Sequence, residues 1–318
     1  MNKTTLKTPI AVDDNAAQAV LTTRQLTKNF GNVCALDHID SQIAGGSVYG
    51  LIGSNGAGKS TFLRLAAGVL KADEGEVLYK GEPIFDNAAV KQNIFFVPDT
   101  PWFMFDTLES CADFYRSVYT NWSDTAYRAL LDIFPIDPKD NLTGFSKGMR
   151  RQATLILALA SKPDLLLMDE AFDGLDPVMR QNLKRLLAVD VAERGMTVVI
   201  ASHNLRELED FCDHVGLLHR GGLLLQEEID HLRFGILKVQ VAFSEEPDEA
   251  TLKARGLNVL RAKKKGALIE WLLRNTEDEV RRVIDPLNPL LFEVLPLQLE
   301  EIFIYELGEH AYAVHELL

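Results

Sequence analysis

The sequence predicts an α/β fold with a mainly parallel sheet, a helical insertion and a second, smaller α+β domain. Along the first two thirds of the chain, short apolar runs alternate with amphipathic segments, as strands and helices alternate in such folds. Residues 165–168 are apolar at every position, which is typical of a strand buried on both faces of a parallel sheet. After Leu225 the pattern changes, so we expect roughly two domains.

The first part of the chain predicts several short strands and one helix. Residues 1–19 are polar, rich in alanine and without periodicity, and we expect a flexible tail there. Residues 62–70 have a helical pattern. Apolar clusters, separated by turn signals at residues 29–32 and 72–75, predict strands at residues 20–26, 39–43, 48–52, 76–79 and 93–97.

A helical subdomain is expected from about residue 99 to residue 160. One face of its first helix carries Leu108, Cys111, Phe114, Tyr115 and Val118. Pro135 and Pro138 break this pattern, and a second helix is expected at residues 147–160. The segment therefore interrupts the alternation of strands and helices and is predicted to be an insertion into the α/β fold.

After the helical insertion, the chain returns to alternating strands and helices, and from residue 226 its pattern is that of an α+β domain. Helices at residues 178–192 and 205–212 alternate with strands at residues 196–201 and 214–219. Residues 226–318 predict an accessory α+β domain with strands at residues 237–243, 257–263 and 267–273 and helices at residues 245–255 and 277–284.

Composition and charge narrow the class of protein. The chain has 318 residues and a formal net charge of −13, which argues against a nucleic-acid-binding surface. No apolar run reaches the roughly 18 residues of a spanning helix, and no secretory signal is apparent. The three cysteines are scattered, as is usual in a reducing compartment. We expect a cytoplasmic protein that serves a membrane only by docking on a partner.

Residues 53–61 match the phosphate-loop pattern G-x-x-x-x-G-K-[ST]. A predicted strand precedes them and a predicted helix follows, so that backbone N–H groups and the helix dipole would face an anion. Lys59 would reach the β- and γ-phosphates of ATP, and the Ser60 hydroxyl would ligate Mg²⁺. The predicted nucleotide-binding residues of this loop are Gly53, Ser54, Asn55, Gly56, Ala57, Gly58, Lys59, Ser60 and Thr61.

Two carboxylates follow the apolar strand at residues 165–168. They are Asp169 and Glu170, and they would lie at the carboxyl edge of the sheet, where ligands bind in open α/β folds. Asp169 can hold Mg²⁺, and Glu170 can act as the general base that activates water. Together with the phosphate loop, this acidic pair predicts hydrolysis of a nucleotide.

With these motifs in place, the chain resembles the nucleotide-binding subunit of an ABC transporter. Residues 145–149 (FSKGM) stand where that family carries its LSGGQ signature, and Ser146 and Gly148 match it. Phe145, Lys147 and Met149 depart from it, in a form that resembles ATPases of two-component ABC-2 exporters. The resemblance covers about residues 20–225 and implies a P-loop NTPase (RecA-like) core with an antiparallel β edge.

The resemblance also implies roles for single residues. Phe30 would stack on adenine, and His203 would contact the γ-phosphate and orient the base. Ser146 and Gly148 would face the ATP held by a second subunit. Asp99 stands where the family usually has a glutamine, and it is expected to reach Mg²⁺ or its water. An alternative for Asp99 is an ordinary residue of a turn after Pro98.

Two functions remain open at this point. The first is the ATPase motor of a transporter, which would act in export through a separate transmembrane subunit. It would form a homodimer, or a heterodimer with a second ABC ATPase, and would be peripheral at the inner face of the membrane. Residues 98–114, with the bulky segment 101–105, are expected to dock on that subunit. The alternative is a soluble ABC ATPase acting on a ribosome or a nucleic-acid complex.

Overall fold

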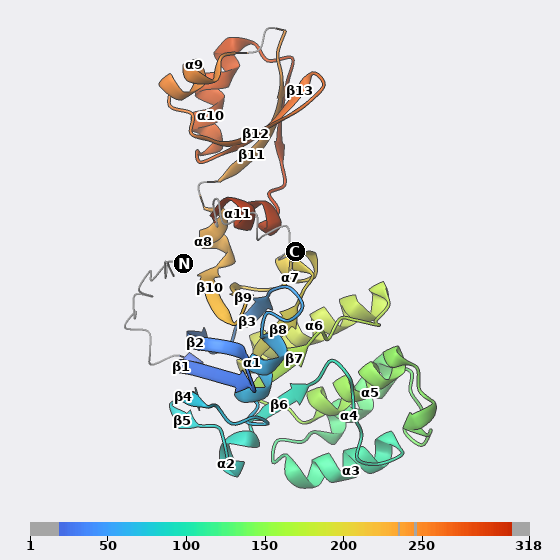
Figure 1. Cartoon of the computed structure of the whole chain (residues 1–318). Coiled ribbons are helices and arrows are strands. Elements are labelled where there is room, and N and C mark those ends of the chain that lie inside the picture. Colours follow the sequence, from blue (N-terminus) through green and yellow to red (C-terminus); the bar gives the residue numbers. More distant parts are fainter. Residues whose placement is uncertain (1–18, 235, 245–246, 307–318) are drawn as a thin grey trace.

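The computed structural model describes residues 19–234, 236–244 and 247–306 of the chain. Within these residues, no helix is both long and apolar enough to cross a membrane. The tail expected at residues 1–19 lies outside the described part except for Ala19, with which the first strand begins. Figure 1 shows a broad lower body with a smaller unit above it.

A six-stranded sheet forms the centre of the lower body, in the order β10-β9-β3-β8-β7-β6. Its strands pair in parallel except β10, which runs antiparallel to β9. The mainly parallel sheet expected from the sequence is therefore confirmed. The strands are β3 (Val48–Ile52), β6 (Ile94–Val97), β7 (Leu165–Asp169), β8 (Thr197–Ser202), β9 (His214–His219) and β10 (Gly222–Glu228).

The expected antiparallel β edge forms a four-stranded sheet of its own, in the order β2-β1-β4-β5. Helix α1 (Lys59–Ala66) packs its buried side chains into the core cluster that this sheet shares with the central sheet. The helix starts at Lys59, three residues before the predicted start, and it ends at Ala66, before Gly68, which has φ 63° and takes the left-handed conformation common after helix ends. The other elements here are β1 (Ala19–Phe30), β2 (Val33–Ala44), β4 (Glu74–Tyr79), β5 (Glu82–Pro83) and α2 (Ala88–Lys91).

The helical insertion contains three helices where the sequence predicted two. The first predicted helix is divided into two, because one helix ends at Val118 and the next is capped at its N-terminus by Ser123. Val118, expected on the apolar face, is exposed at the end of the first of these helices. Buried side chains of these helices belong to the same core cluster as strands of the central sheet. The helices are α3 (Leu108–Val118), α4 (Asp124–Ile133) and α5 (Lys147–Ala160), and α6 (Pro177–Arg194) follows β7.

The upper unit is a four-stranded antiparallel sheet, in the order β12-β13-β11-β14, with α9 and α10 packed on it. The predicted boundary at residue 225 falls inside β10, and buried residues of α8 and α11 belong to the main core of the lower body. The elements of this unit are β11 (Leu237–Ala242), α9 (Glu249–Ala254), β12 (Val259–Lys265), β13 (Leu268–Leu273), α10 (Glu277–Ile284) and β14 (Leu291–Leu295). Helix α7 (Leu205–Glu209) follows β8 in the lower body, and α8 (Ile229–Arg233) and α11 (Leu299–Glu306) lie between the two units.

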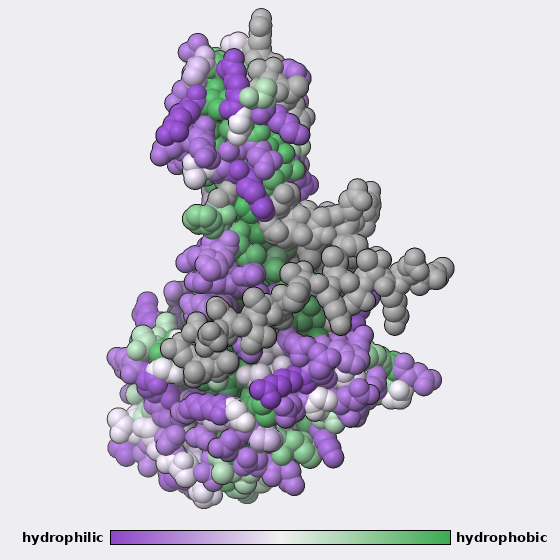
Figure 2. Space-filling model, turned by 90° about the vertical axis from the view of Figure 1, so that its left-hand side faces the viewer, coloured by the Kyte–Doolittle hydropathy of each residue, from purple (hydrophilic) through white to green (hydrophobic). Residues whose placement is uncertain are grey.

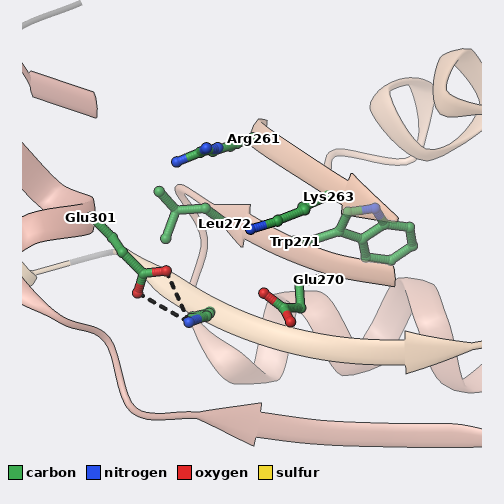
Figure 3. Close-up of a pocket in the computed structure, with 7 residues that line it drawn as sticks. Arg261, Lys263, Glu270, Trp271, Leu272 and Glu301 are labelled. Atoms are coloured by element: carbon green, nitrogen blue, oxygen red, sulfur yellow. Dashed lines mark hydrogen bonds and ion pairs between the residues drawn. The ribbon is translucent and has the colours of Figure 1, made fainter. Parts of the chain in front are cut away.

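Polar contacts of α11 join the two units. The Glu209 carboxylate of α7 accepts from the backbone N–H of Leu299 at 2.9 Å and from Arg233 at 2.9 Å. Glu301 pairs with Lys238 of β11 at 2.9 Å, and both side chains line a small pocket at the upper sheet (Figure 3). Figure 2 shows hydrophilic surface over both units and apolar atoms between them. The upper unit is thus held through α11 to the helix that follows β8.

Candidate nucleotide-binding site

The phosphate loop lies between β3 and α1, as predicted, and packing requires a glycine at positions 53 and 58. Gly58, with φ 111°, precedes the first residue of α1, and a Cβ there would lie 2.6 Å from the carbonyl oxygen of Ala35. A Cβ on Gly53 would lie 2.4 Å from the carbonyl oxygen of Leu218. The loop is therefore pressed against β2 and β9, while the first N–H groups of α1 have no partner within the helix.

Lys59 begins α1 and points back into the loop. Its side chain is 6% exposed, and its Nζ donates to the carbonyl oxygens of Gly53 at 2.6 Å and Ser54 at 3.3 Å. Burial lowers the pKa of Lys59, and the Glu170 carboxylate, 3.6 Å away, opposes this shift. The ammonium group is thus held at the base of an anion-binding loop, as phosphate binding requires.

Glu170 follows β7 with a left-handed backbone, φ 47°, which is uncommon for a residue with a side chain. Its N–H donates to the carbonyl of Ala201 at 2.9 Å, which fixes this conformation against β8. One carboxylate oxygen lies 3.6 Å from Lys59 Nζ, and the other lies 3.0 Å from Nδ1 of His203. The structure therefore brings together the three residues predicted to be catalytic.

Asp169 ends β7 and is almost fully buried. Burial raises the pKa of Asp169, and a hydrogen bond from the Ser60 hydroxyl lowers it. Its Oδ1 is buried and has no hydrogen-bond partner among the described residues. Among the residues that the structure describes, no three His, Cys, Asp or Glu side chains lie close enough together to hold a metal ion. A cation at Asp169 and Ser60 would thus need further oxygens from a nucleotide or water.

Phe30 lies at the end of β1 with 48% of its surface exposed. Phe30 pairs with Val33 across the hairpin of β1 and β2. Two residues after Val33, the carbonyl group of Ala35 lies against Gly58 of the phosphate loop. The Lys28 ammonium lies 5.7 Å from the centre of its ring. Phe30 therefore presents an open aromatic ring on the strand pair that borders the loop.

Ser146 and Gly148 lie apart from the cluster around Lys59. Ser146 is exposed and caps α5, since its hydroxyl accepts from the backbone N–H of Met149 at 3.2 Å. A Cβ on Gly148 would lie 2.7 Å from the carbonyl oxygen of Gly174, so that α5 packs closely on the turn after β7. Within the described residues, no hydrogen bond or ion pair joins Ser146 to Lys59 or Glu170.

Sequence reasoning missed Arg151, which is fully buried in α5. Its guanidinium donates to the carbonyl oxygens of Pro98 and Asp99 and pairs with the Asp99 carboxylate at 3.3 Å. The predicted metal ligand Asp99 therefore has an arginine partner that was not foreseen. A signal was present, because Arg151 stands four residues before Leu155 and so falls on the apolar face of the predicted helix.

Comparison with known proteins agrees with this geometry. The profile of the ABC transporter family matches residues 36–173. "ABC transporter ATP-binding protein YtrB" of Bacillus subtilis (strain 168) is 32% identical over 286 residues, which are 90% of this chain and 97% of that protein. "Bacitracin transport ATP-binding protein BcrA" of Bacillus licheniformis is 32% identical over 218 residues, 67% of this chain and 71% of that protein.

A solved structure described as an ATP binding subunit of an ABC transporter is also similar, with a TM-score of 0.63 and 26% identity over 67% of this chain and 92% of that chain. The chain belongs to the ABC transporter family. It is an ATP-binding and ATP-hydrolysing subunit of a transporter, and the alternative of a ribosome or nucleic-acid ATPase is not favoured.

Proposed function

We propose that this chain is the motor subunit of an exporter: two ABC ATPase subunits bind two ATP between them, and hydrolysis drives a separate transmembrane subunit. The observation that carries the proposal is the cluster in which Glu170 lies 3.6 Å from Lys59 and 3.0 Å from His203. The resemblance of FSKGM to the signature of two-component exporters supports export. The proposed place of the chain is the inner face of the membrane, where it is peripheral.

ATP binding is assigned to the phosphate loop and Phe30. Residues 53–61 offer backbone N–H groups at the start of α1, and Lys59 lies beneath them. The lysine now donates to loop carbonyls, so phosphate oxygens have to compete for the same N–H groups. The exposed ring of Phe30 offers a face for adenine.

The residues present fit a Mg²⁺ ion that arrives with ATP. Asp169 offers a buried carboxylate oxygen that has no hydrogen-bond partner among the described residues, and the Ser60 hydroxyl bonds to the same side chain. Both are oxygen ligands of the kind that Mg²⁺ prefers, and a few protein ligands suffice because phosphates and water supply the others. When bound, the ion neutralises charge on the phosphates. Asp99 lies at the end of the neighbouring strand, and its carboxylate already pairs with Arg151.

We assign to Glu170 the role of accepting the proton of the attacking water. Its two carboxylate oxygens are held separately by Lys59 and His203, so the carboxylate is oriented before substrate binds. Once Lys59 turns to the phosphates, the oxygen that faced it is free to accept a proton from water. His203 keeps the other oxygen in place and borders the γ-phosphate position.

A second subunit completes the site. Ser146 is exposed at the start of the 14-residue helix α5, where N–H groups and the helix dipole favour an anion. Its hydroxyl is exposed and caps α5, and the resemblance to the signature motif supports a role toward ATP held by another subunit, identical or different. Binding of two ATP would then close the dimer, and hydrolysis would open it.

The transmembrane subunit is proposed to dock on residues 98–114. Trp102 is 73% exposed and Met104 is 55% exposed, so burial within the helical subdomain does not account for them. The segment follows β6 directly, and β6 pairs with β7, which carries Asp169. Movement at the nucleotide therefore has a short path to the docked partner.

The substitution Glu170→Gln tests the proposal. Loss of the general base should lower ATP turnover by about a hundredfold or more, while ATP binding persists. The variant should accumulate as a dimer with ATP and Mg²⁺, measured by gel filtration and by phosphate release.

The matched control is Glu193→Gln, which removes an exposed carboxylate of α6. It should behave as the wild-type chain in both assays. Turnover within a factor of about three of wild type in Glu170→Gln would remove Glu170 from the role of base, because such a change is below the usual effect of a general base.

A further inference from the structure

Arg151 carries a charge in the interior of the protein. Its side chain is fully buried, and its donors are directed at the chain just after β6. Nη1 donates to the carbonyl oxygen of Pro98 at 2.5 Å, and Nη2 donates to the carbonyl oxygen of Asp99 at 2.5 Å and to its carboxylate at 3.3 Å. Burying a guanidinium is unfavourable unless it is paired and hydrogen-bonded, so this position has a specific task.

The contact of Arg151 with Pro98 and Asp99 joins helix α5 to the chain that follows β6, and this indicates its task. Pro98 follows Val97, which pairs with Met168, the residue before Asp169 and Glu170. On the other side, Arg151 stands five residues after Ser146, which is about 7.5 Å along the helix. Arg151 therefore fixes the start of α5 to the strand that borders the catalytic carboxylates.

Arg150 contacts the same segment more weakly. Its Nη2 donates to the carbonyl of Pro101 at 3.3 Å, and its guanidinium lies 5.6 Å from the centre of the Phe103 ring. Arg150 is partly exposed, whereas Arg151 is not. The two neighbouring arginines thus offer a matched pair that differs in burial and in the number of partners.

We propose that Arg151 is a positioning residue, which sets the place of Ser146 relative to the nucleotide core through the carbonyls of Pro98 and Asp99. The inference rests on the proposed function, in which Ser146 faces ATP on a second subunit. Asp99 then serves as the anionic partner of Arg151. Since two of the three contacts are to backbone carbonyls, the anchor depends on the forked guanidinium more than on the Asp99 side chain.

The test uses the full-length Glu170→Gln protein as parent and adds Arg151→Gln or, as the control, Arg150→Gln. Binding of a fluorescent ATP analogue to the protomer should stay within about twofold in both, because the phosphate loop is untouched. The protein concentration needed for the ATP-bound dimer should rise about tenfold for Arg151→Gln and change little for Arg150→Gln. Analytical ultracentrifugation measures the dimer.

Arg151→Lys keeps the charge but lacks the fork, and it covers the case in which Arg151→Gln does not fold. It should bind the ATP analogue as the parent does and dimerise about threefold to tenfold more weakly. Dimerisation of Arg151→Lys within about twofold of the parent overturns the inference, since a merely charged residue would then suffice. A parent that does not dimerise with ATP overturns the proposed function itself, and the inference with it.

Discussion

At the scale of single residues, the site consists of groups that are unfavourable to bury and are held by few partners. Lys59 is buried and its pKa is lowered, while Asp169 is buried and its pKa is raised, because burial disfavours both charged forms. Glu170 adds a left-handed backbone, which strains a residue with a side chain. Such groups persist because the surrounding sheet fixes them, and phosphate and cation would satisfy the charges that remain.

Gly58 gives a prediction at this scale. Alanine there meets both a positive φ and a carbonyl oxygen 2.6 Å away, so Gly58→Ala should lower the free energy of unfolding by about 2 kcal/mol or more. Gly81→Ala is the control, because Gly81 has φ 85° but a Cβ added there would meet no other described residue within 4 Å. It should lose only the backbone strain, about 1 kcal/mol. Urea unfolding measures both, and equal losses would refute the packing argument.

At the scale of elements, α5 links three parts of the site. It is capped by Ser146, packs through Gly148 on the turn after β7, and holds the chain after β6 through Arg151. Its exposed first turn is oriented by contacts on two sides. The serine cap satisfies the helix N-terminus in the single chain, and this local role is compatible with a second role at a dimer interface.

Two serine caps allow these roles to be separated. Ser146 caps α5 and Ser123 caps α4, each accepting from the backbone N–H three residues later. Ser146→Ala and Ser123→Ala should each lower the free energy of unfolding by about 1 kcal/mol. Only Ser146→Ala should also reduce the maximal rate of ATP hydrolysis. If both variants lose the same activity, or neither does, Ser146 has no role beyond capping.

At the scale of the whole molecule, the upper unit is attached to the lower body by α8 and α11. Residues of α11 enter the main core, and Glu209 of α7 caps its first turn. Helix α7 begins two residues after His203, so the contact between Glu209 and Leu299 is separated from the site by this short helix alone. Residues 98–114 lie in the helical insertion, away from the upper unit in Figure 1. The molecule thus presents two separate surfaces on either side of the nucleotide core.

The docking segment is tested at this scale with the membrane subunit present. Trp102→Ser together with Phe105→Ser should remove most of the co-purified membrane subunit, since a few apolar anchors supply most of the affinity of such interfaces. ATP hydrolysis by the isolated chain and its melting temperature should stay near wild type, because both rings are exposed. Phe234→Ser, at a ring that is 86% exposed directly after α8, is the control. Undiminished co-purification of the double variant would place the dock elsewhere.

The sequence alone determined the fold class and most of the site. Three parts of the site could be predicted because each is a single continuous stretch of sequence with a recognisable pattern. They are the phosphate loop, the apolar strand before Asp169 and Glu170, and helix α5 at Lys147–Ala160. His203 could be assigned from its strand and the family resemblance. Their meeting in one cluster followed from the rule that parallel strands bring their carboxyl ends to one edge.

Only the tertiary structure decided the contacts between segments far apart in the chain. Arg151 reaches Asp99 across 52 residues, and Leu299 reaches Glu209 across 90. The separate antiparallel sheet and the packing of α11 in the main core also depend on contacts between segments that are far apart in the sequence. The physical reason is that helical and strand periods report which face is buried but not against what, so the partner of a buried arginine or a terminal helix is fixed only when the chain has folded.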